Sequence, residues 1–154
     1  MTSPALATTS TDPLSSPSSA TQDTSAAAQT PLRWVTLCQR EDLVPGSGVA
    51  AWLEADGQAR QIALFTLPAT ADSDDLTLFA IDHHDPVSGA NVIARGLLGD
   101  HAGEPLVISP LYKQRYRLSD GQCLDDDTLA LMVWPVRLAG GEVQIQCQRA
   151  DDAC

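Results

Sequence analysis

The stretch that decides the fold is Phe79–Asp127, FAIDHHDPVSGANVIARGLLGDHAGEPLVISPLYKQRYRLSDGQCLDDD. It holds two proline-containing loops, Asp85–Val87 and Ser109–Tyr112. Short apolar runs typical of strands precede both loops. The second loop leads into YRLSDG, a strand-like run that ends in an Asp-Gly turn signal. We therefore expect a domain organised around two loops, each presented by a strand.

The overall charge of the chain excludes two classes of partner. Its 154 residues carry a formal net charge of −11 at pH 7, and 44% of them are hydrophobic. Proteins that bind nucleic acid need a basic face for the phosphate backbone, and anionic membrane surfaces also attract basic segments. The sequence therefore predicts a packed acidic domain that binds neither nucleic acid nor an anionic membrane.

The four cysteines, Cys38, Cys123, Cys147 and Cys154, show no metal-binding spacing. Neither C-x-x-C nor C-x-H occurs, so the cysteines predict no zinc site and no cluster. The N-terminus has no basic residue before Arg33 and no apolar core of a signal peptide. No run approaches the roughly 20 apolar residues of a membrane helix. We expect a cytoplasmic protein with reduced thiols.

The composition changes at residue 32, which suggests the domain boundary. Residues 1–31 are mostly Thr, Ser, Ala, Pro and Gln. Such a segment buries too little apolar surface to offset the entropy lost on ordering, so we expect a disordered tail. Residues 32–148 are expected to form one domain, and residues 149–154 a short C-terminal tail.

The pattern of short runs and turn signals predicts an all-β fold. Apolar runs of strand length are separated by dipeptides that favour turns and hairpins, and no long helical period interrupts them. This pattern is typical of an antiparallel sandwich or barrel of short strands. The turn signals lie at Pro45-Gly46, Asp56-Gly57, Asp120-Gly121 and Ala139-Gly140-Gly141.

The two loops resemble the cluster-binding loops of the Rieske iron–sulfur fold. In that family the first loop reads Cys-x-His and the second Cys-x-x-His, with the thiolates on one iron and the imidazoles on the other. Here Asp85 and Ser109 stand at the cysteine positions, and Val87 and Tyr112 at the histidine positions. Valine has no donor atom, and neither a hydroxyl nor a phenol replaces a soft thiolate. The resemblance therefore implies a Rieske-like fold without a cluster, and its scaffold matches are Pro86, Pro110, Tyr116, Leu118 and Gly121.

One branch of this family has the same loss of ligands, the small subunit of the bacterial NAD(P)H-dependent nitrite reductase. The chain is similar to that subunit from Trp34 to Cys147. The shared motifs are W-V-T-L-C-x-x-x-D-L-x-P-G-x-G-V, I-x-x-x-D-P, R-G-L-x-x-x-H-x-G-E and S-P-L-x-K-Q-R-Y-R-L-S-D-G-x-C. Their order and spacing together, rather than any single motif, identify the branch.

This resemblance implies a role in reducing nitrite to ammonium with electrons from NADH or NADPH. In the family the large subunit carries the FAD, an iron–sulfur cluster and the sirohaem. This chain would carry no cofactor, metal or catalytic residue, and would bind the large subunit and complete its activity. Two alternatives stay open: a stand-alone Rieske-like binding module for another oxidoreductase, and a Rieske-type electron carrier with unusual ligands.

Four basic residues form the candidate partner-binding surface. Lys113, Arg115 and Arg117 are spaced at i, i+2 and i+4, so on a strand they would share one face while Tyr116 faces the core. Arg95 would join them if the two loops meet, as they do in Rieske domains. We call these four residues the basic stripe. It could dock an acidic partner surface, although a solvated strand face fits the same pattern.

Adjacent histidines raise the alternative of a metal site. His83 and His84 lie between Asp82 and Asp85. Neighbouring strand residues point to opposite faces, so the two imidazoles could share an ion only in a loop. Two partly exposed loop histidines are the simpler interpretation.

Two further local features suggest structure rather than chemistry. The run Asp125–Asp127 has no EF-hand spacing and suggests the start of a helix with Asp127 as the N-cap. Trp34, Trp52 and Trp134 lie in apolar runs and are expected in the core. An exposed tryptophan at an interface would instead anchor a partner.

Overall fold

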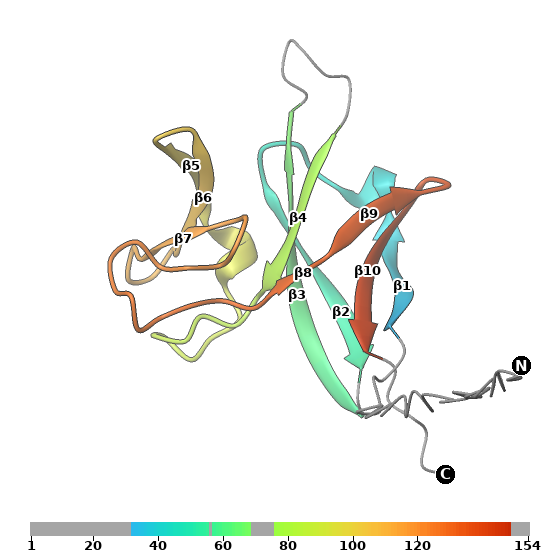
Figure 1. Ribbon diagram of the computed structural model, residues 1–154, viewed down its shortest axis with the longest axis horizontal. Helices are drawn as coiled ribbons and strands as arrows, with labels where there is room; N and C mark the ends of the chain where they lie inside the picture. Colours follow the sequence, from blue (N-terminus) through green and yellow to red (C-terminus); the bar gives the residue numbers. More distant parts are fainter. Residues whose placement is uncertain (1–31, 56, 69–75, 149–154) are drawn as a thin grey trace, which may run out of the picture.

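The computed structural model describes residues 32–55, 57–68 and 76–148. The expected tails, 1–31 and 149–154, lie outside the described residues. Within the described part, short strands dominate, and the all-β prediction is confirmed (Figure 1). The elements are β1 (Leu32–Gln39), η1 (Arg40–Asp42), β2 (Gly48–Ala55), β3 (Gln58–Leu67), β4 (Thr77–Asp82), η2 (Ile93–Arg95), β5 (Leu97–His101), β6 (Glu104–Ile108), β7 (Arg115–Arg117), β8 (Val133–Trp134), β9 (Val136–Ala139) and β10 (Glu142–Gln148).

The strands form three antiparallel sheets. Their strand orders are β1-β10-β9, β2-β3-β4-β8 and β5-β6-β7. In Figure 1 the β2-β3-β4-β8 sheet lies in the middle, with β5-β6-β7 on its left and β1-β10-β9 on its right. The predicted hairpins are present, because Ala55 pairs with Gln58 and Ala139 pairs with Glu142.

The central sheet is covered on both faces along β3. On β3, Ile62 and Leu64 face the core shared with β10, whereas Ala63 and Phe65 face the core shared with β6 and β7. All four side chains are fully buried. A strand with apolar residues on both faces is typical of a covered strand. The second of these cores holds the two candidate loops in place.

One of the three tryptophans contradicts the prediction that all are in the core. Trp52 is 58% exposed. It lies on the same face of β2 as Gly48, since the two are four residues apart. A Cβ on Gly48 would collide with the carbonyl oxygen of Ala94, so η2 covers that end of the strand. Trp52 lies beyond this cover. Of the other two, Trp34 is half-buried with the Arg137 guanidinium 4.0 Å from its ring centre.

The acidic run does not start a helix, so the N-cap prediction for Asp127 is wrong. Asp126 makes the turn instead, because its Oδ1 accepts hydrogen bonds from the Thr128 amide at 3.0 Å and the Thr128 hydroxyl at 2.6 Å. This is the competing local bond that short polar side chains offer the backbone. Asp125 points elsewhere and accepts the backbone N–H of Arg115 at 2.8 Å.

Candidate functional site

The first loop (residues 83–92) closes on itself around Asp85. The Asp85 amide donates to the Ala90 carbonyl at 2.8 Å, and the Gly89 amide donates to the Asp85 carbonyl at 2.8 Å. The side chain also turns back on the loop, because Asp85 Oδ1 accepts the Val87 amide at 2.9 Å. This side-chain turn is the local geometry that aspartate favours.

The second loop (residues 109–114) is closed in a similar way. The Ser109 amide donates to the Gln114 carbonyl at 2.8 Å, and the Lys113 amide donates to the Ser109 carbonyl at 3.2 Å. Lys113 takes the left-handed conformation, with φ of 66°. Its ammonium donates to the Pro110 carbonyl at 3.0 Å. A residue other than glycine rarely adopts this backbone conformation.

A direct side-chain hydrogen bond joins the two loops. Ser109 Oγ donates to Asp85 Oδ2 at 2.6 Å, and both residues are 0% exposed. A short hydrogen bond from a hydroxyl to a carboxylate is among the stronger kinds in proteins. We call Asp85 and Ser109 the inner pair. They stand where the resemblance places the two cysteine ligands, and their hydrogen bond joins the two loops.

The residues at the two histidine positions behave differently. Val87 is 37% exposed and Tyr112 is 61% exposed. Leu111, the neighbour of Tyr112, is also 54% exposed. We call Val87 and Tyr112 the outer pair. The two loops thus present apolar side chains to solvent directly above a buried polar contact.

The residues present do not fit the cluster that the fold family implies. A 2Fe–2S Rieske centre needs two thiolates and two imidazoles. The inner pair offers a carboxylate and a hydroxyl that already bond to each other, and Val87 has no donor atom. Residues 32–148, apart from the two gaps in the description, contain no group of three or more His, Cys, Asp or Glu side chains that could hold a metal ion.

Tyr116 lies beneath the loops, where burial and the nearby Asp85 carboxylate act on its phenol. The side chain is fully buried, and its hydroxyl has no hydrogen-bond partner in the described part of the chain. Burial, and after it the negative charge of Asp85, raises the pKa of Tyr116 to about 12. The phenol is therefore neutral throughout the physiological range.

The structure divides the basic stripe. The predicted strand is shorter than expected, since β7 spans only Arg115–Arg117 and Lys113 lies in the second loop. Arg115 forms a salt bridge with Asp125. Arg117 lies 2.6 Å from Asp120 and 3.6 Å from Glu104. The prediction that Lys113 shares a strand face with the two arginines is wrong, whereas the burial of Tyr116 is confirmed.

Two members of the stripe keep their charge available to a partner. Within the described residues, neither Lys113 nor Arg95 forms a salt bridge. Arg95 ends η2 and is exposed. A Cβ on the next residue, Gly96, would collide with the carbonyl oxygen of Ile108, which precedes the inner-pair serine. Arg95 is therefore close to the base of the second loop, as expected if the loops meet.

The two histidines face different surroundings, and the prediction of partial exposure is wrong for His83. Its side chain is 4% exposed, and its Nδ1 accepts the Ala94 amide at 2.9 Å. Burial lowers the pKa of His83. The negative charge of Asp82 raises this pKa in part, and the positive charge of Arg95 lowers it further. His84 is exposed and lies 3.3 Å from the Asn91 side-chain oxygen. The pair does not share one site.

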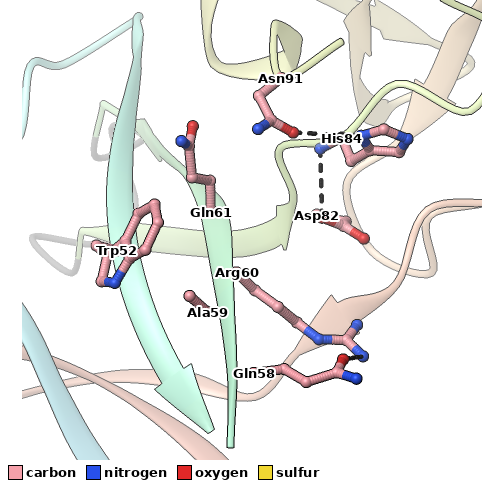
Figure 2. Close-up of a pocket in the computed structure, with 8 residues that line it drawn as sticks. All are labelled: Trp52, Gln58, Ala59, Arg60, Gln61, Asp82, His84 and Asn91. Atoms are coloured by element: carbon pink, nitrogen blue, oxygen red, sulfur yellow. Dashed lines mark hydrogen bonds between the residues drawn. The ribbon is translucent and has the colours of Figure 1, made fainter. Parts of the chain in front are cut away.

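A second feature, an open hollow of about 450 Å³, was not predicted. Figure 2 shows the Trp52 ring on β2 at one side and His84 with Asn91 at the other. The sequence gives no signal for it, because Trp52 lies in an apolar run as the other two tryptophans do. The hollow is lined by Trp52, Gln58, Ala59, Arg60, Gln61, Asp82, His84 and Asn91.

Comparison with known proteins gives a consistent result. The family profile of the Rieske-like [2Fe-2S] domain matches residues 33–146. A nitrite reductase (NADH) small subunit from Salmonella typhimurium is 39% identical over 114 residues, which are 74% of this chain and 97% of that protein. A crystal structure from Mycobacterium tuberculosis, described as an NADH-dependent nitrite reductase small subunit, has 39% identity and a TM-score of 0.65. The match covers 76% of this chain and 96% of that one.

A further relative is much longer. The nitrite reductase [NAD(P)H] large subunit from Klebsiella oxytoca is 43% identical over 116 residues. The match covers 75% of this chain but only 11% of that protein. In that organism a domain similar to this one is part of the polypeptide named the large subunit.

Among the described residues, no helix is long and apolar enough to cross a membrane.

Proposed function

The chain belongs to the Rieske-like [2Fe-2S] domain family, in the branch of the nitrite reductase small subunits, and we propose that it binds a large subunit and completes its activity. The complex would reduce nitrite to ammonium with electrons from NADH or NADPH, in an assimilatory or detoxifying role in the cytoplasm. The large subunit would hold the FAD, the iron–sulfur cluster and the sirohaem. This chain would act without a cofactor of its own.

The observation that carries the accessory role is the hydrogen bond between Ser109 and Asp85. It occupies the position at which an electron carrier of this fold would need two thiolates. An oxidoreductase subunit that cannot hold a cluster can still act through the surface that it presents to its partner. The alternative of a Rieske-type carrier is therefore less well supported than the accessory role.

Association with a large subunit is supported by the Klebsiella oxytoca protein. There, a domain similar to this chain is covalently part of the large subunit. A separate chain would reach the same arrangement by non-covalent binding. We propose that the end of the molecule bearing the basic stripe makes this contact, with Lys113 and Arg95 contributing more than Arg115 and Arg117. The charges of the last two are matched by Asp125 and Asp120.

The test is reconstitution with the large subunit from the same organism. The two chains are expressed together and separately, and NADH- and NADPH-dependent nitrite consumption and ammonium formation are followed. We expect the chains to co-purify, and we expect the large subunit alone to lose activity that the added small chain restores. A large subunit that neither binds this chain nor changes its activity on adding it would overturn the proposal. It would favour a binding module for another oxidoreductase.

A further inference from the structure

We propose that four residues of the two loops, Pro86, Val87, Leu111 and Tyr112, insert into an apolar recess of the large subunit whose rim carries carboxylates. We call these four residues the apolar tip. This inference rests on the proposed function and names the docking site within it.

The exposed apolar side chains of the two loops lie at one end of the molecule. Val87, Leu111 and Tyr112 come from two loops that are far apart in sequence. A single carboxylate connects them, since Asp85 accepts the Val87 amide on one oxygen and the Ser109 hydroxyl on the other. The side chains that follow each of these anchors are therefore at the same end of the molecule. Exposed apolar side chains that gather in this way mark interaction sites more often than isolated ones do.

The two loops that form the tip are held by their own hydrogen bonds. Backbone hydrogen bonds of 2.8 to 3.2 Å close both loops, three within residues 83–92 and two within residues 109–114. The Lys113 ammonium also donates to the Pro110 carbonyl across the second loop. Docking a preorganised loop loses little conformational entropy, so more of the contact energy appears as affinity. Tyrosine is also one of the residue types that most often dominate binding energy.

Two unmatched positive charges define the rim of the recess. Lys113 follows Tyr112 in the second loop, Arg95 lies near the base of that loop, and neither has a carboxylate partner among the described residues. The chain as a whole has a net charge of −11. An acidic rim on the large subunit would attract this end and repel the rest of the molecule. Such complementarity sets the orientation of binding more than its strength.

The hollow beside Trp52 is the alternative docking site for the large subunit. The side chains that line it are less suited to an apolar contact than those of the apolar tip. Trp52 is as exposed as Tyr112, at 58% against 61%. It is, however, a single aromatic ring among amide and charged side chains. Arg60, with Gln58 at 3.5 Å, and Asp82 place both signs of charge in the hollow (Figure 2). Trp52 therefore provides a matched control for the loss of an exposed aromatic side chain.

The experiment measures the affinity of the full chain for its large subunit by calorimetry or surface plasmon resonance. The double variant Leu111→Ser, Tyr112→Ser is compared with Trp52→Ser and with the parent. All three substituted side chains are exposed, so both variants should fold, and their thermal unfolding is recorded as a check. We expect the tip variant to bind at least about tenfold more weakly, and Trp52→Ser to bind within about twofold of the parent.

If the parent binds the large subunit and the tip variant binds with the same affinity, the inference is overturned and the proposed function is unaffected. Loss of binding in Trp52→Ser alone would also overturn it and move the docking site to the hollow. A parent chain that does not bind would overturn the proposed function itself. For the rim, Arg95→Gln should reduce the salt dependence of the affinity, and an unchanged salt dependence would exclude carboxylates opposite Arg95.

Discussion

The inner and outer pairs stand at the four positions where the resemblance to Rieske domains places the cluster ligands, yet they have different surroundings. Asp85 and Ser109 are sealed from solvent and hydrogen-bonded, while Val87 and Tyr112 are exposed. The inner pair joins the two loops through its hydrogen bond. The outer pair contributes two of the exposed side chains that we propose to bind a partner. Substitutions in the inner pair should therefore lower the stability of the fold, whereas substitutions in the outer pair should leave it almost unchanged.

The largest expected effect follows Asp85→Ala. This change removes the acceptor of both the Ser109 hydroxyl and the Val87 amide at a fully buried position. Leaving buried donors without partners should lower the free energy of unfolding by about 2–4 kcal/mol. Urea denaturation of the variant and the parent measures it. Asp85→Asn keeps an acceptor for the amide and serves as the milder control. A loss below about 1 kcal/mol in Asp85→Ala would remove the distinction between the pairs.

Ser109→Ala should have a smaller effect of about 1–2 kcal/mol, because the carboxylate keeps the Val87 amide as a donor. The double variant with Asp85→Ala is the sharper measurement. If the inner pair acts as one contact, the double variant should lose less stability than the sum of the two single losses. Strict additivity would mean that the two side chains stabilise the loops independently.

A third prediction concerns the buried phenol of Tyr116 at high pH. The pKa of this phenol is raised in the folded state, to about 12, so the neutral form is the one that folding favours. Its contribution to stability is complete below the unfolded pKa of about 10 and is lost as the pH rises through the folded value. The stability of the parent should therefore fall more steeply above pH 10 than that of Tyr116→Phe. Parallel curves for the two proteins would contradict the assigned shift.

The smallest effect on stability is expected at the outer pair. Val87→Ser and Tyr112→Ser remove exposed side chains and should change the free energy of unfolding by no more than about 0.5 kcal/mol. Differential scanning calorimetry of the two variants is sufficient. If either variant is destabilised as strongly as Asp85→Ala, the outer pair is part of the packing, and its assignment to the surface is wrong.

Much of the fold could be predicted from local sequence signals. Asp-Gly and Gly-Gly turns mark hairpins because they supply backbone conformations that other residues avoid. The two-sided burial of the central sheet follows from strands such as β3, whose successive residues Ile62 to Phe65 are all apolar. The two loops were found because proline and the surrounding motif are retained, even though the ligands are not.

The contacts that define the site could not be predicted in the same way. The hydrogen bond between Asp85 and Ser109 joins residues 24 positions apart, and neither residue type signals such a partner. The left-handed backbone of Lys113 belongs to the turn that its amide closes on the Ser109 carbonyl, and the strand pattern of its neighbours does not signal it. Trp52 is exposed because the cover of η2 stops short of it. These features depend on tertiary structure, which overrides local preference.

The most direct test of the account is an assay of iron and acid-labile sulfide, with an absorption spectrum, on the chain purified anaerobically from cells that assemble clusters. If the inner pair has replaced the cluster as the link between the loops, the protein should be folded, colourless and free of both elements. A visible Rieske-type spectrum with iron and sulfide in stoichiometric amounts would contradict the account. It would show that Asp85 and Ser109 separate to admit a cluster, and that the chain carries electrons itself.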